Sequence, residues 1–195
     1  MSTDKPTILL LGGTGQVGHH LRRTLASVGT VHAPGRGEVD LAAPEALRAA
    51  VRERTPDLIV NAAADTDVDG AEEAPERSAA INAEAPGVLA AAAQETGAWL
   101  VHYSTDYVFD GTQRRPYTEG DAPNPINVYG RTKREGEQRI AAVGGQHVIL
   151  RTSWVYSARR SNFVRTMLGL ADTHDQPTVV GDQTGVPTWA GWIAE

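Results

Sequence analysis

The feature that most constrains the fold is a glycine-rich turn near the N-terminus. An apolar run at Thr7–Leu11 enters the sequence GGTGQVG at 12–18. Within it, Gly12, Gly15 and Gly18 are spaced G-x-x-G-x-x-G and open a segment with helical periodicity, which predicts a strand, a tight turn and a helix. Such glycines let the backbone approach a pyrophosphate, which the helix N-terminus faces with unpaired N–H groups. The spacing predicts a dinucleotide-binding turn, and a plain strand–helix turn is the alternative.

The rest of the chain alternates between short apolar runs and Ala-rich or charged stretches, which predict strands and helices respectively. Further strands are predicted at Val31–Ala33, Leu58–Val60, Trp99–Ser104, His147–Leu150 and Thr178–Val180. Helices are predicted at Pro44–Arg54, Ala79–Thr96 and Val128–Ala142, with a loop at 110–127 and another helix beginning at Trp189. This alternation predicts an α/β fold with a doubly wound, Rossmann-like parallel sheet.

Composition excludes several classes of protein. A length of 195 residues corresponds to one domain, or one domain and part of a second. The absence of cysteine excludes disulfides, thiolate metal sites and a cysteine nucleophile, and the six histidines lack metal-ligand spacing. A formal net charge of −6 without a dense basic cluster argues against nucleic-acid binding. No apolar stretch approaches the roughly 20 residues that a membrane-spanning helix needs, and the N-terminus does not resemble a signal peptide. We therefore expect a cytoplasmic chain without membrane or nucleic-acid partners.

The loop after the second predicted strand bears on the choice of nucleotide. An acidic residue there is typical of NAD binding, because it accepts a hydrogen bond from the ribose 2′-OH. Here Arg36 stands between two glycines and could pair with a 2′-phosphate. We therefore predict NADPH, while Glu38 nearby keeps NADH as an alternative.

Tyr129 and Lys133 form the candidate catalytic pair. They lie four residues apart in a predicted helix and therefore on one face of it. A phenol with a pKa of about 10 is a poor acid–base group at neutral pH, and an adjacent ammonium stabilises its anion. Such a pair can protonate a developing alkoxide while a hydride arrives from a cofactor. Thr105, after the strand Trp99–Ser104, is the third candidate, because its hydroxyl can bind a carbonyl oxygen; a threonine that caps the next turn is the alternative.

These motifs together resemble the extended short-chain dehydrogenase/reductases and, more closely, the dTDP-4-dehydrorhamnose reductase family. Beyond the glycine turn, the resemblance rests on NAAA at 61–64, TDVDGAE at 66–72, STDYVFDG at 104–111, PINVYGRTK at 125–133, RTSWVY at 151–156 and DQTGVPT at 182–188. It implies reduction of the C4 ketone of dTDP-4-dehydro-L-rhamnose by NAD(P)H.

The resemblance also implies roles for individual residues. Tyr129 would donate the proton, Lys133 would hold the nicotinamide ribose, and Thr105 would bind the ketone oxygen. Besides Arg36, Tyr129 and Lys133, the implied cofactor contacts are Gly12, Gly15, Gln16, Val17, Asp40, Leu41, Ala62, Ala63 and Ala64. The implied sugar contacts are Val68, Asp106 and Trp154, with a core indole as the alternative for Trp154.

Some family members bind Mg²⁺ through a glutamate where this chain has His20, so no metal is predicted. The resemblance implies a dinucleotide-binding domain at 1–150 and the start of a substrate-binding region at 151–195. Family members continue further, so we expect a truncated chain with an incomplete substrate-binding part. The alternatives are a reductase of another dTDP-4-keto-6-deoxysugar, a non-catalytic nucleotide-binding regulatory subunit, and a fragment that binds the cofactor alone. A homodimer is also left open.

Overall fold

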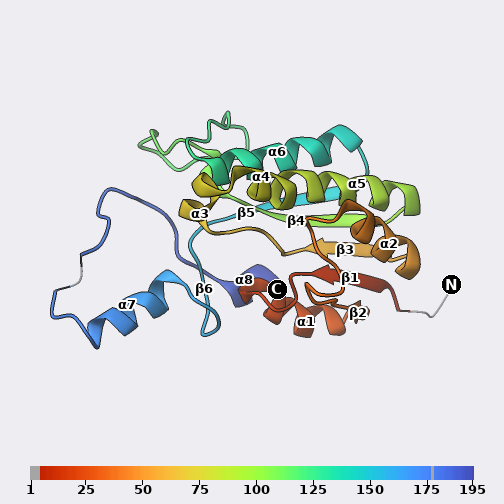
Figure 1. The fold of residues 1–195 in the computed structure, drawn as a ribbon, viewed down its shortest axis with the longest axis horizontal. Coiled ribbons are helices and arrows are strands. Elements are labelled where there is room, and N and C mark those ends of the chain that lie inside the picture. The colour runs from red at the N-terminus through yellow and green to blue at the C-terminus, as the bar shows by residue number, and fades with distance from the viewer. Residues whose placement is uncertain (1–4, 177) are drawn as a thin grey trace.

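The protein is described by a computed structural model covering residues 5–176 and 178–195, in which a parallel sheet lies between two layers of helices (Figure 1). The sheet contains β1 (Thr7–Leu11), β2 (Thr30–His32), β3 (Leu58–Asn61), β4 (Trp99–Thr105) and β5 (His147–Thr152), in the order β2-β1-β3-β4-β5. Every neighbouring pair of these strands is parallel. The predicted doubly wound, Rossmann-like α/β fold is confirmed.

Helices connect the strands and cover both faces of the sheet. In chain order they are α1 (Gln16–Ala26), α2 (Pro44–Arg54), α3 (Val68–Glu73), α4 (Pro75–Ala79), the π-helical turn η1 (Ala80–Glu84), α5 (Ala85–Thr96), the 3-10 turn η2 (Asp106–Val108), α6 (Val128–Val143), α7 (Phe163–Ala171) and α8 (Ala190–Ala194). Two short strands, β6 (Val155–Tyr156) and β7 (Thr188–Trp189), form a second parallel sheet. In the described ranges, no helix combines the length and apolar character needed to cross a membrane.

The central strand β1 carries side chains into two separate cores, because successive residues of a strand face opposite sides of the sheet. Ile8 and Leu10 pack with Leu21 of α1, on the side that α8 also covers. Leu9 and Leu11 pack in the other core, which draws on α2, α5 and α6. All five side chains are buried, as the nearly continuous apolar sequence of β1 requires.

The strand order reverses between β1 and β3, and in such sheets a crevice opens at this point beyond the carboxyl ends of the strands. The chain leaves β1 through the glycine turn. Gly12 adopts a φ of +79°, and a Cβ there would lie 2.7 Å from the carbonyl carbon of Ala62. A Cβ on Gly18 would overlap the Gly12 carbonyl oxygen. Glycine is therefore required at both positions to bring β1, α1 and the segment after β3 together.

The predicted elements from β1 to β5 are confirmed with small shifts at their ends, although Ala79–Thr96 is divided by the π-helical turn η1. The strand predicted at Thr178–Val180 is wrong. This run lies in no strand, and Val179 and Val180 are exposed, because no neighbouring strand pairs with them within the described residues. The short helix α3 and the helix α7, which extends away from the sheet in Figure 1, were not predicted.

Candidate active site

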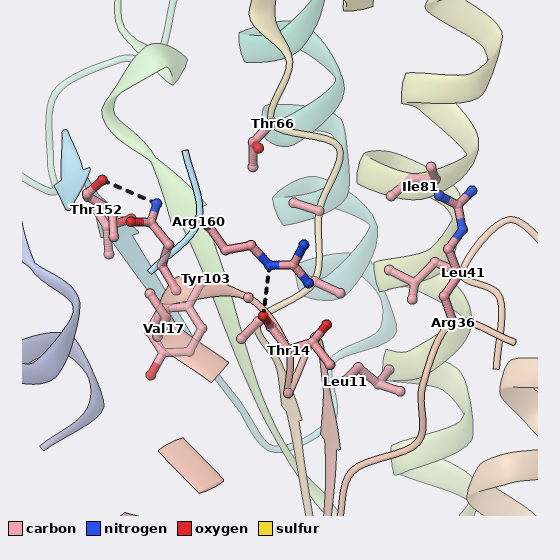
Figure 2. Close-up of a pocket in the computed structure, with 18 of the residues that line it drawn as sticks. Leu11, Thr14, Val17, Arg36, Leu41, Thr66, Ile81, Tyr103, Thr152 and Arg160 are labelled. Carbon is pink, nitrogen blue, oxygen red and sulfur yellow. Dashed lines mark hydrogen bonds between the residues drawn. The ribbon is translucent and has the colours of Figure 1, made fainter. Parts of the chain in front are cut away.

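A cleft of about 680 Å³ opens at the carboxyl edge of the sheet, where the strand order reverses. Its walls come from the glycine turn, the loop after β2, the segment after β3, the end of β4 and helix α6 (Figure 2). This volume is within the range of small-molecule and cofactor sites.

Every residue predicted to contact a cofactor lines this one cleft, which the structure assembles from segments distant in sequence. These residues are Gly12, Gly15, Gln16, Val17, Arg36, Asp40, Leu41, Ala62, Ala63, Ala64, Tyr129 and Lys133. Helix α1 begins after Gly15 without a side-chain cap and has no acidic residue in its first turn. Its first N–H groups are therefore available to an anion, as a pyrophosphate site requires.

The loop after β2 presents a cation to the cleft. Arg36 is exposed and lines the cleft, whereas Glu38 does not. The Glu38 carboxylate instead accepts a hydrogen bond from the Gly35 N–H at 2.8 Å and closes the turn. These residues fit a dinucleotide that carries a 2′-phosphate. Across residues 5–176 and 178–195, the His, Asp and Glu side chains form no group of three or more suited to a metal ion.

Lys133 of α6 lines the cleft and is buried against β4. Its Nζ donates a hydrogen bond to the Tyr103 carbonyl oxygen at 2.6 Å and lies 3.4 Å from His102 Nε2. On the far side of the ring, His102 Nδ1 lies 3.1 Å from Asn61 Nδ2. Burial lowers the pKa of Lys133 to about 8, against the opposing charge of Glu137. Burial and the Lys133 charge hold the pKa of His102 well below its usual range, so this imidazole stays neutral at neutral pH.

Tyr129 is 9% exposed, and its ring packs edge-on against Tyr107 with centroids 5.6 Å apart. Burial raises the pKa of Tyr129 to about 12; a hydrogen bond with Thr105 opposes the shift and the Asp106 charge adds to it. The phenol is therefore protonated at neutral pH. The Lys133 ammonium is bonded to a main-chain carbonyl of β4, and its stabilisation of the Tyr129 phenolate stays a prediction.

Thr105 caps the turn η2, and its hydroxyl also lies beside the phenol of Tyr129. Its Oγ1 accepts a hydrogen bond from the Tyr107 N–H at 3.2 Å and donates one to Asp106 Oδ1 at 3.2 Å, at the start of η2. Thr105 does not line the cleft, although the preceding Ser104 does. The residues predicted to contact the sugar, which are Val68, Asp106 and Trp154, also lie outside the cleft lining. Trp154 is 39% exposed, so it is not a core indole.

Sequence reasoning missed Arg160 and Ser161, which line the cleft from the segment between β6 and α7. No motif marks either residue. The segment is attached to the glycine turn through Gln16, whose Oε1 accepts hydrogen bonds from Ser157 Oγ at 3.0 Å and Asn162 Nδ2 at 2.9 Å.

Comparisons with known proteins agree with this geometry. A family model described as RmlD substrate binding domain matches residues 6–195. A dTDP-4-dehydrorhamnose reductase from Burkholderia thailandensis is 50% identical over 188 residues, which is 96% of this chain and 63% of the relative. A probable dTDP-4,6-dihydroxy-2-methyloxan-3-one 4-ketoreductase from Streptomyces antibioticus is 42% identical over 189 residues, which is 96% of this chain and 64% of the relative.

The crystal structure of a dTDP-4-dehydrorhamnose reductase from Bacillus anthracis in complex with NADP has a TM-score of 0.93 at 35% identity, over 97% of this chain and 68% of that chain. This chain spans only 63% and 64% of the length of the two curated relatives. The family match, by contrast, extends over nearly the whole chain, with the glycine turn, Tyr129 and Lys133 inside it. The chain belongs to the RmlD substrate binding domain family.

Proposed function

We propose that this chain binds NADPH and reduces the C4 ketone of dTDP-4-dehydro-L-rhamnose to give dTDP-L-rhamnose. The observation that carries the proposal is that a buried, protonated phenol and a buried lysine, Tyr129 and Lys133, line the same cleft as the glycine turn. Support comes from the Burkholderia thailandensis relative, named for this activity, and from the Bacillus anthracis relative, which was crystallised with NADP.

NADPH, when bound, supplies the hydride that adds to the carbonyl carbon. Tyr129 transfers its phenolic proton to the carbonyl oxygen, so that the ketone becomes a secondary alcohol. With a pKa of about 12, the phenol keeps its proton at neutral pH and gives it up only to a stronger base, such as the alkoxide that forms when the hydride adds. Lys133 holds the nicotinamide ribose, and Thr105 orients the ketone oxygen by exchanging its bond to Asp106.

The remaining cofactor contacts follow the walls of the cleft. The glycine turn and the N-terminus of α1 take the pyrophosphate. Arg36 pairs with the 2′-phosphate and favours NADPH over NADH, while Asp40 and Leu41 lie against the adenine. Ala62–Ala64 would back the cofactor. We also propose that 1–150 is the dinucleotide-binding domain, that 151–195 contributes to substrate binding, and that the enzyme is a cytoplasmic homodimer.

Val68, Asp106 and Trp154 are proposed to contact the sugar. A second candidate is a reductase of another dTDP-4-keto-6-deoxysugar, favoured by the Streptomyces antibioticus relative, whose name specifies a different ketone. A regulatory subunit and a fragment that binds only the cofactor are weaker rivals, because neither needs Thr105, Tyr129 and Lys133 together.

The test measures the loss of NADPH absorbance when the chain is given dTDP-4-dehydro-L-rhamnose, with other dTDP-4-keto-6-deoxysugars assayed in parallel. Tyr129→Phe should lower turnover roughly 10²- to 10⁴-fold while the variant still binds NADPH. Tyr117→Phe is the matched control, because that phenol bonds to Asp110 in the loop after η2, away from the cleft lining. If the chain binds NADPH but turns over none of these 4-keto sugars, the catalytic proposal is refuted. The remaining alternatives are then the regulatory subunit and the fragment that binds only the cofactor.

A further inference from the structure

Arg160 places a guanidinium over the glycine turn. The residue lies between β6 and α7, and its Nε donates a hydrogen bond to the Thr14 carbonyl oxygen at 3.1 Å. Figure 2 shows the Arg160 side chain crossing the cleft beside Thr14. The terminal nitrogens of the guanidinium make no hydrogen bond within the part of the chain that the structure describes. One N–H of an arginine thus bonds to a neutral carbonyl, and the rest of its donor fork is available at the cleft.

The segment that carries Arg160 is attached firmly to α1. Gln16 accepts hydrogen bonds from Ser157 and Asn162 and donates one to the Val155 carbonyl oxygen at 3.4 Å. Ser157 is itself buried. A side chain on a segment held in this way loses less conformational freedom when it binds a ligand than one on a free loop.

The backbone of Arg160 is in the left-handed region, with φ at +60°. Residues other than glycine adopt this conformation infrequently, and such outliers cluster where the surrounding structure holds a functional side chain. Asn162 contributes to holding it here, because its Nδ2 donates a hydrogen bond to the Ser157 carbonyl oxygen at 2.9 Å and its Oδ1 accepts one from the Arg165 N–H at 3.2 Å.

Charge in the cleft is unevenly distributed. Among the described residues that line it, four carry charge: Arg36, Asp40, Lys133 and Arg160. Arg36 and Asp40 follow β2, and Lys133 is buried against β4. Arg160 is the one of the four that bonds to the glycine turn, where the N–H groups of α1 are also available. A planar guanidinium beside free N–H groups is suited to a phosphate with two adjacent charged oxygens.

We propose that Arg160 binds the pyrophosphate of the dinucleotide, exchanging its bond to the Thr14 carbonyl for the phosphate oxygens. The inference rests on the proposed binding of NADPH and adds a cation to the phosphate end of that site. It assigns different phosphates to two arginines: Arg160 contacts the pyrophosphate, and Arg36 the 2′-phosphate. NADP⁺ and NAD⁺ share the first group and differ in the second, so the two assignments can be separated.

The test compares the dissociation constants of NADP⁺ and NAD⁺, measured by isothermal titration calorimetry, for the wild type, Arg160→Gly and Arg36→Ala. Glycine suits the backbone of position 160, so this variant removes the side chain without adding strain, and thermal melting should show it at least as stable as the wild type. A charge-assisted bond of this kind corresponds to roughly a ten- to hundredfold change in affinity. Arg160→Gly should raise both dissociation constants by the same factor, whereas Arg36→Ala should raise that of NADP⁺ alone.

Two results would overturn the assignment of Arg160. Unchanged affinity of Arg160→Gly for both nucleotides would show that the side chain contacts neither. A loss confined to NADP⁺ would show that Arg160 contacts the 2′-phosphate instead of the pyrophosphate. If the wild type binds neither nucleotide, the proposed function itself is wrong, and the inference falls with it.

Discussion

Glu137 of α6 joins three elements beneath the candidate active site. Its Oε1 accepts hydrogen bonds from Ser104 Oγ at 2.6 Å and Arg151 Nε at 2.8 Å, and its Oε2 accepts them from Arg134 Nη1 at 2.8 Å and Arg151 Nη2 at 2.7 Å. Glu137 is 3% exposed. Because Ser104 precedes Thr105, this carboxylate also helps to fix the end of β4.

Replacing Glu137 with glutamine keeps the shape of the side chain but removes its charge and turns a donor toward the arginines. Breaking one side of a buried ion pair costs about 3–5 kcal/mol. Arg134 and Arg151 have side chains 30% and 24% exposed and can regain some hydration, so we expect the lower value, about 3 kcal/mol. For a domain of this size, that free energy corresponds to a fall in melting temperature of about 6–12 °C.

Urea unfolding followed by circular dichroism measures this change. The matched control is Glu135→Gln on the same helix, because Glu135 pairs with Arg139 at 2.7 Å with both side chains 47% exposed. Such exposed pairs contribute only about 0.3–0.5 kcal/mol. If Glu137→Gln and Glu135→Gln lower the free energy of unfolding equally, the reasoning about burial is refuted.

The free energy of unfolding of the wild type and of Glu137→Gln should also depend differently on pH. Burial raises the pKa of Glu137, but hydrogen bonds from Arg151, Ser104 and Arg134 outweigh it and hold the pKa below its usual value of 4.5. A carboxylate of this kind stabilises the fold above its unfolded-state pKa and loses that contribution as the pH falls through the folded-state pKa. The stability advantage of the wild type over Glu137→Gln should therefore shrink as the pH falls below 4.5.

Two other substitutions test the turn and the buried lysine. Gly18→Ala should cost about 1–3 kcal/mol and weaken NADP⁺ binding, because its Cβ overlaps the Gly12 carbonyl oxygen; Gly37→Ala, with no heavy atom within 4 Å, should melt like the wild type. Equal melting temperatures for the two would contradict the close approach. Burial lowers the pKa of Lys133 from 10.5 to about 8, so keeping this lysine charged destabilises the folded state, and each pKa unit is worth about 1.4 kcal/mol. Lys133→Met removes the charge and should stabilise the fold at neutral pH by up to about 3 kcal/mol, less the cost of leaving the Tyr103 carbonyl unpaired. The gain should shrink as the pH rises above 8, where the folded wild type loses its proton. A gain that stays constant across that range would show that burial does not lower the pKa of Lys133.

The sheet and the cofactor wall of the cleft follow from local signals in the sequence. The run TILLL at Thr7–Leu11 is apolar throughout because both faces of β1 are covered. The glycines at 12 and 18 meet backbone that only a residue without a side chain can approach. Parallel strands bring their carboxyl ends to one edge, so the segments after β1, β2 and β3 had to meet there.

These local signals do not predict the direction in which a side chain points. The spacing of Tyr129 and Lys133 places both on one face of α6, but the carbonyl of Tyr103 determines where the ammonium points. Likewise, the apolar run Thr178–Val180 has the composition of a strand, and a strand forms only where a neighbour supplies hydrogen bonds. Arg160 illustrates a further limit, because its place in the cleft depends on a contact with residue 14.

The contacts of Gln16 also determine when the phosphate end of the cleft is completed during folding. They join residues that are 139, 141 and 146 positions apart in the chain. Closing contacts over such distances costs more chain entropy than forming the local strand–turn–helix of β1 and α1. The glycine turn should therefore form early, with its first neighbours, and gain its attachment to the segment around Ser157 late. During synthesis, a ribosome-bound chain would hold the nucleotide loosely until that segment had emerged and docked.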